Sequence, residues 1–190
     1  MLQHLQHGRR RLAVEMERLR LRPDAHPRNT NAAIRSLPSE PAVCFLCLGN
    51  ICRSPLAERY FRERLSDADF DCATVRSAGF IDKEGRSSPD AAVSVAREFG
   101  VDLTDHRSQC VDDDLLRESD IVLLMDAWNY WYLKRGYENE LDKAYFLRSF
   151  VEDEDFEIED PYSANEATFR RVYGEVTGAV DGLLTSLEDR

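Results

Sequence analysis

The chain has 190 residues, of which 32% are charged, and its formal net charge at pH 7 is −11. The length suits one domain with a full core, and the acidic balance argues against nucleic acid as a partner. The five cysteines are odd in number and contain no pair of CxxC motifs with the spacing of a zinc site, so neither a disulfide framework nor a metal is expected. No apolar run could span a bilayer, and the N-terminus lacks the apolar stretch of a secretory signal. We therefore expect a cytoplasmic protein with no stable membrane insertion.

The first 40 residues differ from the rest. They hold eight Arg and four Asp or Glu and carry a net charge of +4, so residues 41–190 carry a net charge of −15. Leu12, Met16 and Leu19 recur at helical spacing, and four prolines between residues 23 and 41 predict an extended linker. Residues 1–40 are thus predicted to be a basic, flexible N-terminal extension, and removal of residues 1–38 is expected to leave catalysis on small aryl phosphates intact. A basic amphipathic helix that touches acidic lipid or a partner is the alternative.

From residue 41 the pattern alternates between strands and helices. Strands are predicted at residues 42–48, 71–77, 121–125 and 143–147. Helices are predicted from the end of the first loop to about 66, from a Ser88 N-cap to Gly100, at 112–118, at 126–135, and from a Ser163–Glu166 capping box to about 187. Such alternation predicts a single α/β domain over residues 41–190, a three-layer sandwich with a central parallel four-stranded sheet. Ligands bind at the carboxyl ends of such strands.

The first strand leads into a short loop that opens a helix, and this loop holds the most informative residues. Backbone N–H groups of such a loop and the helix N-terminus favour an anion, and a thiol beside them ionises more readily. Cys47 begins the loop, and Arg53 can offer a bidentate fork to two phosphoryl oxygens. Gly49 and Asn50 suit close backbone approach and positive φ, and Ser54 can donate to the thiolate.

The full string Cys-Leu-Gly-Asn-Ile-Cys-Arg-Ser-Pro-Leu-Ala-Glu, residues 47–58, closely resembles the phosphate-binding loop of the low-molecular-weight protein tyrosine phosphatases. The resemblance covers about residues 41–188. It implies a phosphatase that hydrolyses phosphotyrosine through a cysteinyl phosphate, with no cofactor and no metal. Its partners would be a tyrosine-phosphorylated protein and phosphate or another oxyanion. The residues implied to bind substrate around Cys47 and Arg53 are Leu48, Gly49, Asn50, Ile51, Cys52 and Ser54.

A second element resembles the same family. Asp160-Pro161-Tyr162 lies just before the last predicted helix, where the family carries its general acid. Asp160 is implied to protonate the leaving phenolate and then to serve as base toward water. Tyr162 is implied to contact the substrate. Family members specific for phosphoarginine tend to have threonine where this chain has Ile51, so isoleucine favours phosphotyrosine.

Weaker matches leave several roles open. His106 could be a catalytic base or a histidine that hydrogen-bonds a loop, and Asp126 could brace Arg53 or cap its own helix. Aromatic and apolar candidates for the walls of a narrow cleft are Ile51, Phe80, Trp128, Tyr130, Trp131 and Tyr162.

Two other functions share this loop. A thioredoxin-coupled arsenate reductase has the same fold, but it needs resolving cysteines in and after the third strand, where this chain has Met125 and Asp126. A phosphate-binding module that has lost catalysis is the other alternative, although Cys47, Arg53 and Asp160 are all present.

Overall fold

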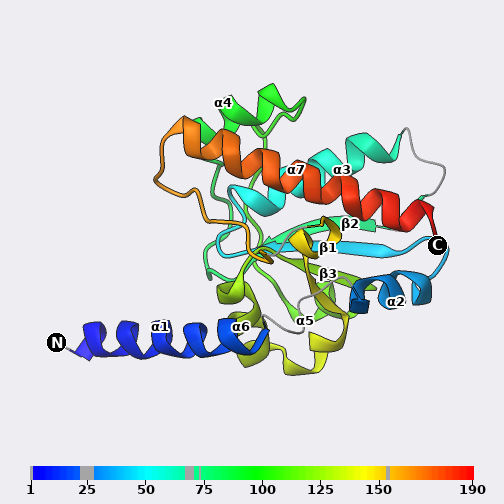
Figure 1. Ribbon diagram of the computed structural model, residues 1–190. Helices are drawn as coiled ribbons and strands as arrows, with labels where there is room; N and C mark the ends of the chain where they lie inside the picture. Colours follow the sequence, from blue (N-terminus) through cyan, green and yellow to red (C-terminus); the bar gives the residue numbers. More distant parts are fainter. Residues whose placement is uncertain (1, 22–27, 67–70, 73, 153–154) are drawn as a thin grey trace.

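The computed structural model describes residues 2–21, 28–66, 71–72, 74–152 and 155–190. Its centre is a parallel sheet with the strand order β2-β1-β3-β4 (Figure 1). The strands are β1 (Ala42–Cys47), β2 (Thr74–Gly79), β3 (Ile121–Leu124) and β4 (Ala144–Phe146). Helices cover both faces of this sheet, so the predicted three-layer α/β fold with four parallel strands is confirmed.

Alternating residues of β1 point into two separate cores, because successive side chains of a strand face opposite sides. Val43, Phe45 and Cys47 pack under α3 (Arg53–Leu65), α4 (Asp90–Glu98) and the long α7 (Glu166–Glu188). Cys44 and Leu46 face the opposite core, which is closed by α5 (Asp113–Arg117) and α6 (Ala127–Gly136). Short 3-10 helices, η1 (Glu138–Lys143) and η2 (Leu147–Phe150), flank β4. Burial on both faces explains why β1 is apolar throughout.

The predicted helix starts were wrong in two places. Ser88 is not the cap of α4, since Pro89 holds the N-cap position without a side-chain hydrogen bond. The predicted Ser163–Glu166 capping box is absent, because Ser163 turns the chain with a φ of +68° and α7 starts later. Asn165 caps that helix by accepting from the Thr168 backbone N–H at 3.0 Å.

The extended linker between prolines was wrong for residues 28–36, which form α2 (Arg28–Ser36). Ile34 and Thr30 of this helix are buried, and Ile34 belongs to the core beneath α7. A proline at the start of a helix does not prevent its formation. Packing of Ile34 in the core stabilises this short helix although prolines flank it in the sequence. Of the rest of that prediction, residues 37–41 contain neither helix nor strand, and residues 22–27 lie outside the described residues.

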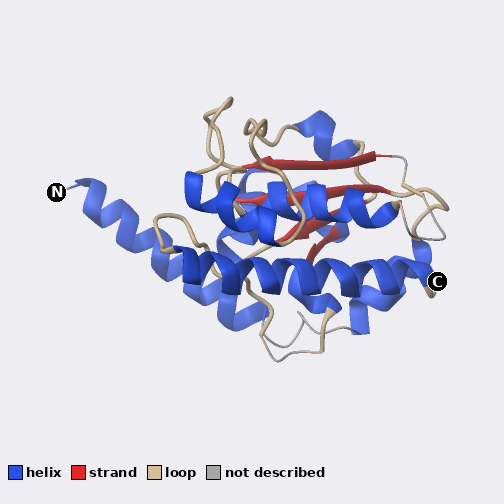
Figure 2. Ribbon diagram, turned by 90° about the horizontal axis from the view of Figure 1, so that it is seen from above, coloured by secondary structure: helices blue, strands red, loops and turns tan. Residues whose placement is uncertain are grey.

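Residues 2–21 form helix α1 (Leu2–Leu21), which lies beside α6 and projects from the domain at its N-terminal end (Figures 1 and 2). The residue that docks is Val14, whose side chain is only 1% exposed against Ala127 and Trp131. Leu12, Met16 and Leu19, which we picked out from their spacing, are exposed. Among the described helices, none is long and apolar enough to cross a membrane.

Candidate active site

The loop after β1 folds around the sulfur of Cys47. The Cys47 side chain is buried, and its Sγ accepts hydrogen bonds from the Asn50 backbone N–H at 3.1 Å and the Ser54 hydroxyl at 3.0 Å. The next helix, α3, begins at Arg53. The sulfur therefore accepts from one loop N–H group and from a hydroxyl in the first turn of α3, and a helix N-terminus favours negative charge.

Asn50 holds this loop in shape. Its φ is +50°, a left-handed conformation that asparagine tolerates. Its side-chain amide donates to Ser54 Oγ at 2.9 Å and Ser77 Oγ at 2.8 Å, while Oδ1 accepts from the Gln109 N–H at 2.9 Å. Its carbonyl accepts from His106 Nε2 at 2.7 Å. These contacts place His106 as a hydrogen-bonding residue behind the loop, and burial lowers the pKa of this imidazole.

Gly79, at the end of β2, fixes the other side of the loop. A Cβ on this residue would lie 2.7 Å from the Asn50 nitrogen and 2.8 Å from the Gly49 carbonyl carbon, closer than real Cβ contacts. The loop can thus approach β2 only because residue 79 has no side chain. By contrast, a Cβ on Gly49 would meet its neighbours at an ordinary 3.5 Å.

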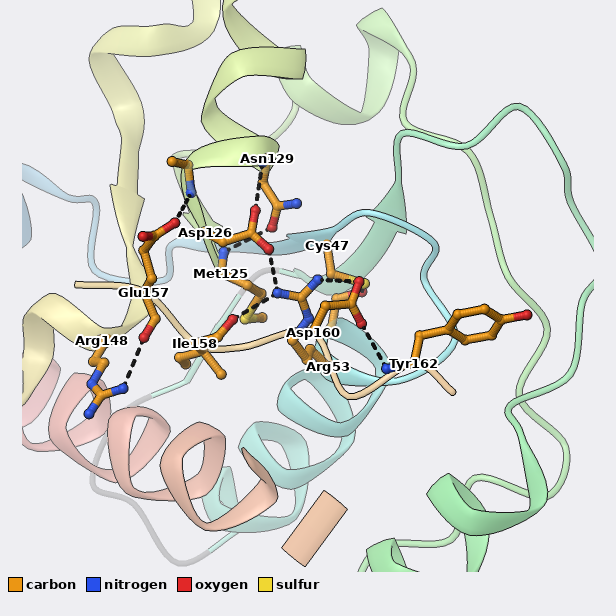
Figure 3. Close-up of polar contacts among 12 residues, drawn as sticks. Cys47, Arg53, Met125, Asp126, Asn129, Arg148, Glu157, Ile158, Asp160 and Tyr162 are labelled. Carbon is orange, nitrogen blue, oxygen red and sulfur yellow. Dashed lines mark hydrogen bonds and ion pairs between the residues drawn. The ribbon is translucent and has the colours of Figure 1, made fainter. Parts of the chain in front are cut away.

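Arg53 extends beneath the loop and is only 1% exposed (Figure 3). Nη1 donates to Asp126 Oδ2 at 2.5 Å and to the Ile158 carbonyl at 2.9 Å, and Nη2 pairs with Asp160 Oδ2 at 2.9 Å. Burial alone would lower the pKa of Arg53, but the carboxylates of Asp126 and Asp160 outweigh it and raise that pKa. Nε is buried and has no hydrogen-bond partner within the described part of the chain. A buried cation with a spare donor suits an anionic ligand.

Asp126 performs both of the roles that the sequence left open. Oδ2 accepts from Arg53, and Oδ1 accepts from the Asn129 N–H at 2.8 Å, which caps α6. Asn129 in turn accepts from the Met125 N–H through Oδ1 at 3.1 Å. The brace on Arg53 is therefore fixed to the start of a helix.

Asp160 is partly exposed at the mouth of the site. Oδ1 accepts from the Tyr162 N–H at 3.1 Å, while Oδ2 faces Arg53 (Figure 3). The Tyr162 ring is 62% exposed and points away from Arg53 at the rim. A cavity of about 150 Å³ lies between these residues and the loop, and its lining comprises Cys47, Leu48, Gly49, Ile51, Cys52, Ile81, Arg86, Asp160 and Tyr162.

The predicted wall residues are divided between this cavity and other places. Ile51 and Tyr162 line it, but Phe80 and Trp131 line a separate groove, and Tyr130 packs in the core against Phe146. Trp128 lies with Trp131 and Tyr132 under α1. The reason is that α6 carries aromatic residues on several faces, so spacing alone could not tell which face borders the cavity.

Sequence reasoning missed Ile81 and Arg86. The Ile81 N–H donates to the Leu48 carbonyl at 3.0 Å, which seats the chain after β2 on the loop. Arg86 Nη2 donates to the Gly49 carbonyl at 2.5 Å, so the Arg86 guanidinium borders the cavity. The one local signal was Gly85, whose φ of +72° turns the chain just before Arg86.

Two further thiols, Cys44 of β1 and Cys52 of the loop, are buried near the site. Burial raises the pKa of Cys44 to about 12 and likewise raises that of Cys52. Both are neutral at pH 7 and poor nucleophiles. All five cysteines are free. Within the described residues, no group of three or more His, Cys, Asp or Glu is placed to hold a metal ion.

The fold and this site define an α/β protein that offers an oxyanion a loop of N–H groups, a buried arginine and a cysteine sulfur. Residues 42–190 match the family model described as low molecular weight phosphotyrosine protein phosphatase. The low molecular weight phosphotyrosine protein phosphatase of Sus scrofa is 36% identical over 137 residues, which cover 70% of this chain and 86% of that protein.

Two crystal structures show the same likeness. The Erwinia amylovora tyrosine phosphatase AmsI has a TM-score of 0.69 at 30% identity and covers 78% of this chain and 93% of its own. The tyrosine phosphatase Wzb of Escherichia coli K30, in complex with sulphate, has a TM-score of 0.70 at 26% identity and covers 78% of this chain and 99% of its own. The chain belongs to the low-molecular-weight protein tyrosine phosphatase family.

Proposed function

We propose that this protein hydrolyses phosphotyrosine and small aryl phosphates through a cysteinyl-phosphate intermediate. The observation that carries the proposal is that Cys47 and Asp160 line one cavity, while the buried Arg53 guanidinium pairs with the Asp160 carboxyl at 2.9 Å. Family membership over residues 42–190 supports it. The partners proposed are a tyrosine-phosphorylated protein and, in the site, phosphate or another oxyanion, and the setting is a reducing cytoplasm that suits five free thiols.

In the first step the Cys47 thiolate attacks phosphorus on the side opposite the leaving oxygen. A sulfur–phosphorus bond forms, the phosphorus–oxygen bond to the phenol breaks, and Asp160 gives its proton to the departing oxygen. Arg53 and the backbone N–H groups of residues 48–54 hold the equatorial oxygens in the transition state. The unpartnered Nε of Arg53 is available for this contact.

In the second step water attacks the phosphorus of the cysteinyl phosphate. The Asp160 carboxylate takes a proton from this water, the sulfur–phosphorus bond breaks, and inorganic phosphate leaves. The thiolate that departs is the one to which the Ser54 hydroxyl and the Asn50 N–H donate. The same carboxyl thus acts in both directions.

The remaining site residues shape the cavity. We assign substrate contacts to Leu48, Gly49, Ile51, Cys52 and Tyr162, which line the cavity, and to Asn50 and Ser54, which are buried and donate to the Cys47 sulfur. A cavity of about 150 Å³ with Ile51 and Tyr162 at its sides fits the flat ring of a phenyl phosphate. We also propose residues 41–190 as the catalytic domain and residues 1–40 as an N-terminal extension.

The test is turnover of p-nitrophenyl phosphate and of a phosphotyrosine peptide by the full chain, with Cys47→Ser as the control. Activity on both substrates that is lost in the variant supports the proposal. Oxyanion binding without turnover would indicate a module that has lost catalysis. Thioredoxin-dependent arsenate reduction would indicate the reductase. A preference for a phosphoarginine peptide would indicate that phosphoarginine, not phosphotyrosine, is the substrate class.

A further inference from the structure

The N-terminal helix α1 makes a direct connection to the segment that carries Asp160. Beyond the docking of Val14, Lys134 of α6 pairs with Glu17 of α1 at 2.9 Å. Arg18, one residue further, pairs through Nη1 with Glu15 of its own helix and through its other two nitrogens with Glu157. Its Nε lies 2.5 Å from Oε2 and its Nη2 lies 3.1 Å from Oε1, a bidentate pair. Bidentate guanidinium–carboxylate pairs are stronger and geometrically more selective than single contacts.

Glu157 contacts two other parts of the molecule through its carboxylate and a third through its backbone carbonyl. Besides Arg18, Oε1 accepts from the Ala127 N–H at 2.8 Å, the first residue of α6 (Figure 3). The Glu157 carbonyl accepts from Arg148 Nη1 at 2.9 Å. The orientation of this carboxylate therefore bears on residue 127, which directly follows the Asp126 brace of Arg53.

The residue after Glu157 completes the connection to the site. The Ile158 N–H donates to the Met125 carbonyl at 2.7 Å, and the Ile158 carbonyl accepts from Arg53 Nη1 at 2.9 Å. Asp160 follows two residues later. Residues 157–158 are thus bonded to residues 125–127 at the place where Arg53 meets its two carboxylates.

Charge explains why a cation is needed there. A groove of about 370 Å³ beside Asp160 is lined by six acidic residues, Asp126, Asp155, Glu157, Glu159, Asp160 and Glu175, and by three arginines, Arg18, Arg148 and Arg171. Arg148 and Arg171 belong to the region that matches the family, whereas Arg18 comes from the extension. Without Arg18, the Glu157 carboxylate would face its acidic neighbours with less compensation.

We propose that Arg18 is a positioning residue: it holds Glu157, and through it the Asp160 loop and the start of α6, in the geometry that proton transfer requires. Helix α1 would then be a working part of the enzyme. This inference rests on the proposed function, since it assigns Arg18 to the step that Asp160 performs.

The test compares two substrates in the full-length enzyme. Both substrates share the second step, so the comparison uses kcat/KM, which reports the steps up to formation of the cysteinyl phosphate. Loss of positioning should lower kcat/KM for phenyl phosphate, whose leaving group needs a proton, more than for p-nitrophenyl phosphate, whose leaving group does not. For Arg18→Ala we expect about a fivefold loss on phenyl phosphate, the upper range for a partly exposed ion pair, and less than about twofold on p-nitrophenyl phosphate. The loss on phenyl phosphate in Arg18→Lys should lie between those of the wild type and Arg18→Ala, because lysine keeps the positive charge but cannot make the bidentate contact.

The matched control is Arg20→Ala, on the same helix. Arg20 is more exposed, with its side chain at 66% against 32% for Arg18, and it pairs only with Glu17 at 3.7 Å among the ion pairs of the described residues. Its kinetics should equal those of the wild type. In a Glu157→Gln background, Arg18→Ala should add nothing, because Arg18 acts through Glu157.

Hydrogen exchange gives a readout that does not depend on activity. The Ile158 and Ala127 amides should exchange faster in Arg18→Ala than in Arg20→Ala. Unchanged exchange together with equal losses on both substrates would overturn the proposal. A wild type without turnover would refute the proposed function instead, while faster exchange in Arg18→Ala would still support the Arg18 contact.

Discussion

The Ser54 hydroxyl donates a hydrogen bond to the Cys47 sulfur over 3.0 Å, and the same hydroxyl is fixed by the Asn50 amide at 2.9 Å. In the second step of the proposed reaction this donor faces a departing thiolate. Hydrogen bonds to charged groups contribute about 1.5–3 kcal/mol, so Ser54→Ala should slow hydrolysis of the cysteinyl phosphate by about 10- to 100-fold. Stopped-flow release of p-nitrophenol should then show a larger burst than in the wild type. A variant with the wild-type kcat and no larger burst would contradict this role.

Arg53 should not tolerate replacement by lysine. Its two Nη atoms already engage Asp126 and Asp160, and Nε remains for the substrate, a division that one ammonium cannot reproduce. We expect Arg53→Lys to reduce kcat/KM for p-nitrophenyl phosphate by at least about 100-fold, the loss typical of a transition-state donor. Steady-state kinetics measure this, with Arg86→Lys as a comparison at the cavity edge. Similar mild effects in both variants would mean that Arg53 is structural.

Asp160→Asn should affect substrates according to their leaving groups. General acid catalysis is typically worth about 10²–10⁴-fold, and a leaving group that departs without a proton should escape most of that loss. In a plot of kcat/KM against leaving-group pKa, which excludes the shared second step, phenyl phosphate should therefore slow far more than p-nitrophenyl phosphate. Equal slowing would place the acid elsewhere, with Asp126 the next candidate at the site.

His106 should make stability depend on pH. Burial lowers the pKa of His106 in the folded protein, while the unfolded chain binds a proton below the ordinary value of about 6.5. The unfolded state therefore binds more protons in this window, and the free energy of unfolding should fall as pH drops from about 6.5 through the lowered pKa. Urea denaturation of the wild type and His106→Gln at several pH values checks this. The variant should lose less stability on acidification, and parallel curves would contradict the assignment.

The sheet and the loop were predictable because their signals are local. β1 and β3 are short apolar runs buried on both faces. The string from Cys47 to Glu58 runs from the end of β1 through the loop into α3, as predicted. Asn50 was expected to tolerate positive φ, and its φ is +50°. Such features depend on neighbours in sequence, which a pattern can capture.

The rest depends on contacts between distant residues. Arg86 reaches Gly49 and Arg18 reaches Glu157 across 37 and 139 positions, and no spacing rule relates such pairs. Helix α2 forms where prolines predicted a linker, because Ile34 finds a place in the core. The sequence also suggested that residues 1–38 are dispensable. The contacts of Arg18 point the other way, and that expectation stays a prediction until the variants are measured.

The account depends most on Cys47 as the group that receives the phosphoryl moiety. Rapid quenching of the wild type during turnover of p-nitrophenyl phosphate, followed by mass spectrometry of its peptides, tests this directly. We expect one phosphoryl group on the peptide containing Cys47, more of it in Ser54→Ala, and none in a Cys47→Ser variant that no longer turns over. Turnover by Cys47→Ser, or a phosphoryl group on another residue of the active wild type, would contradict the mechanism.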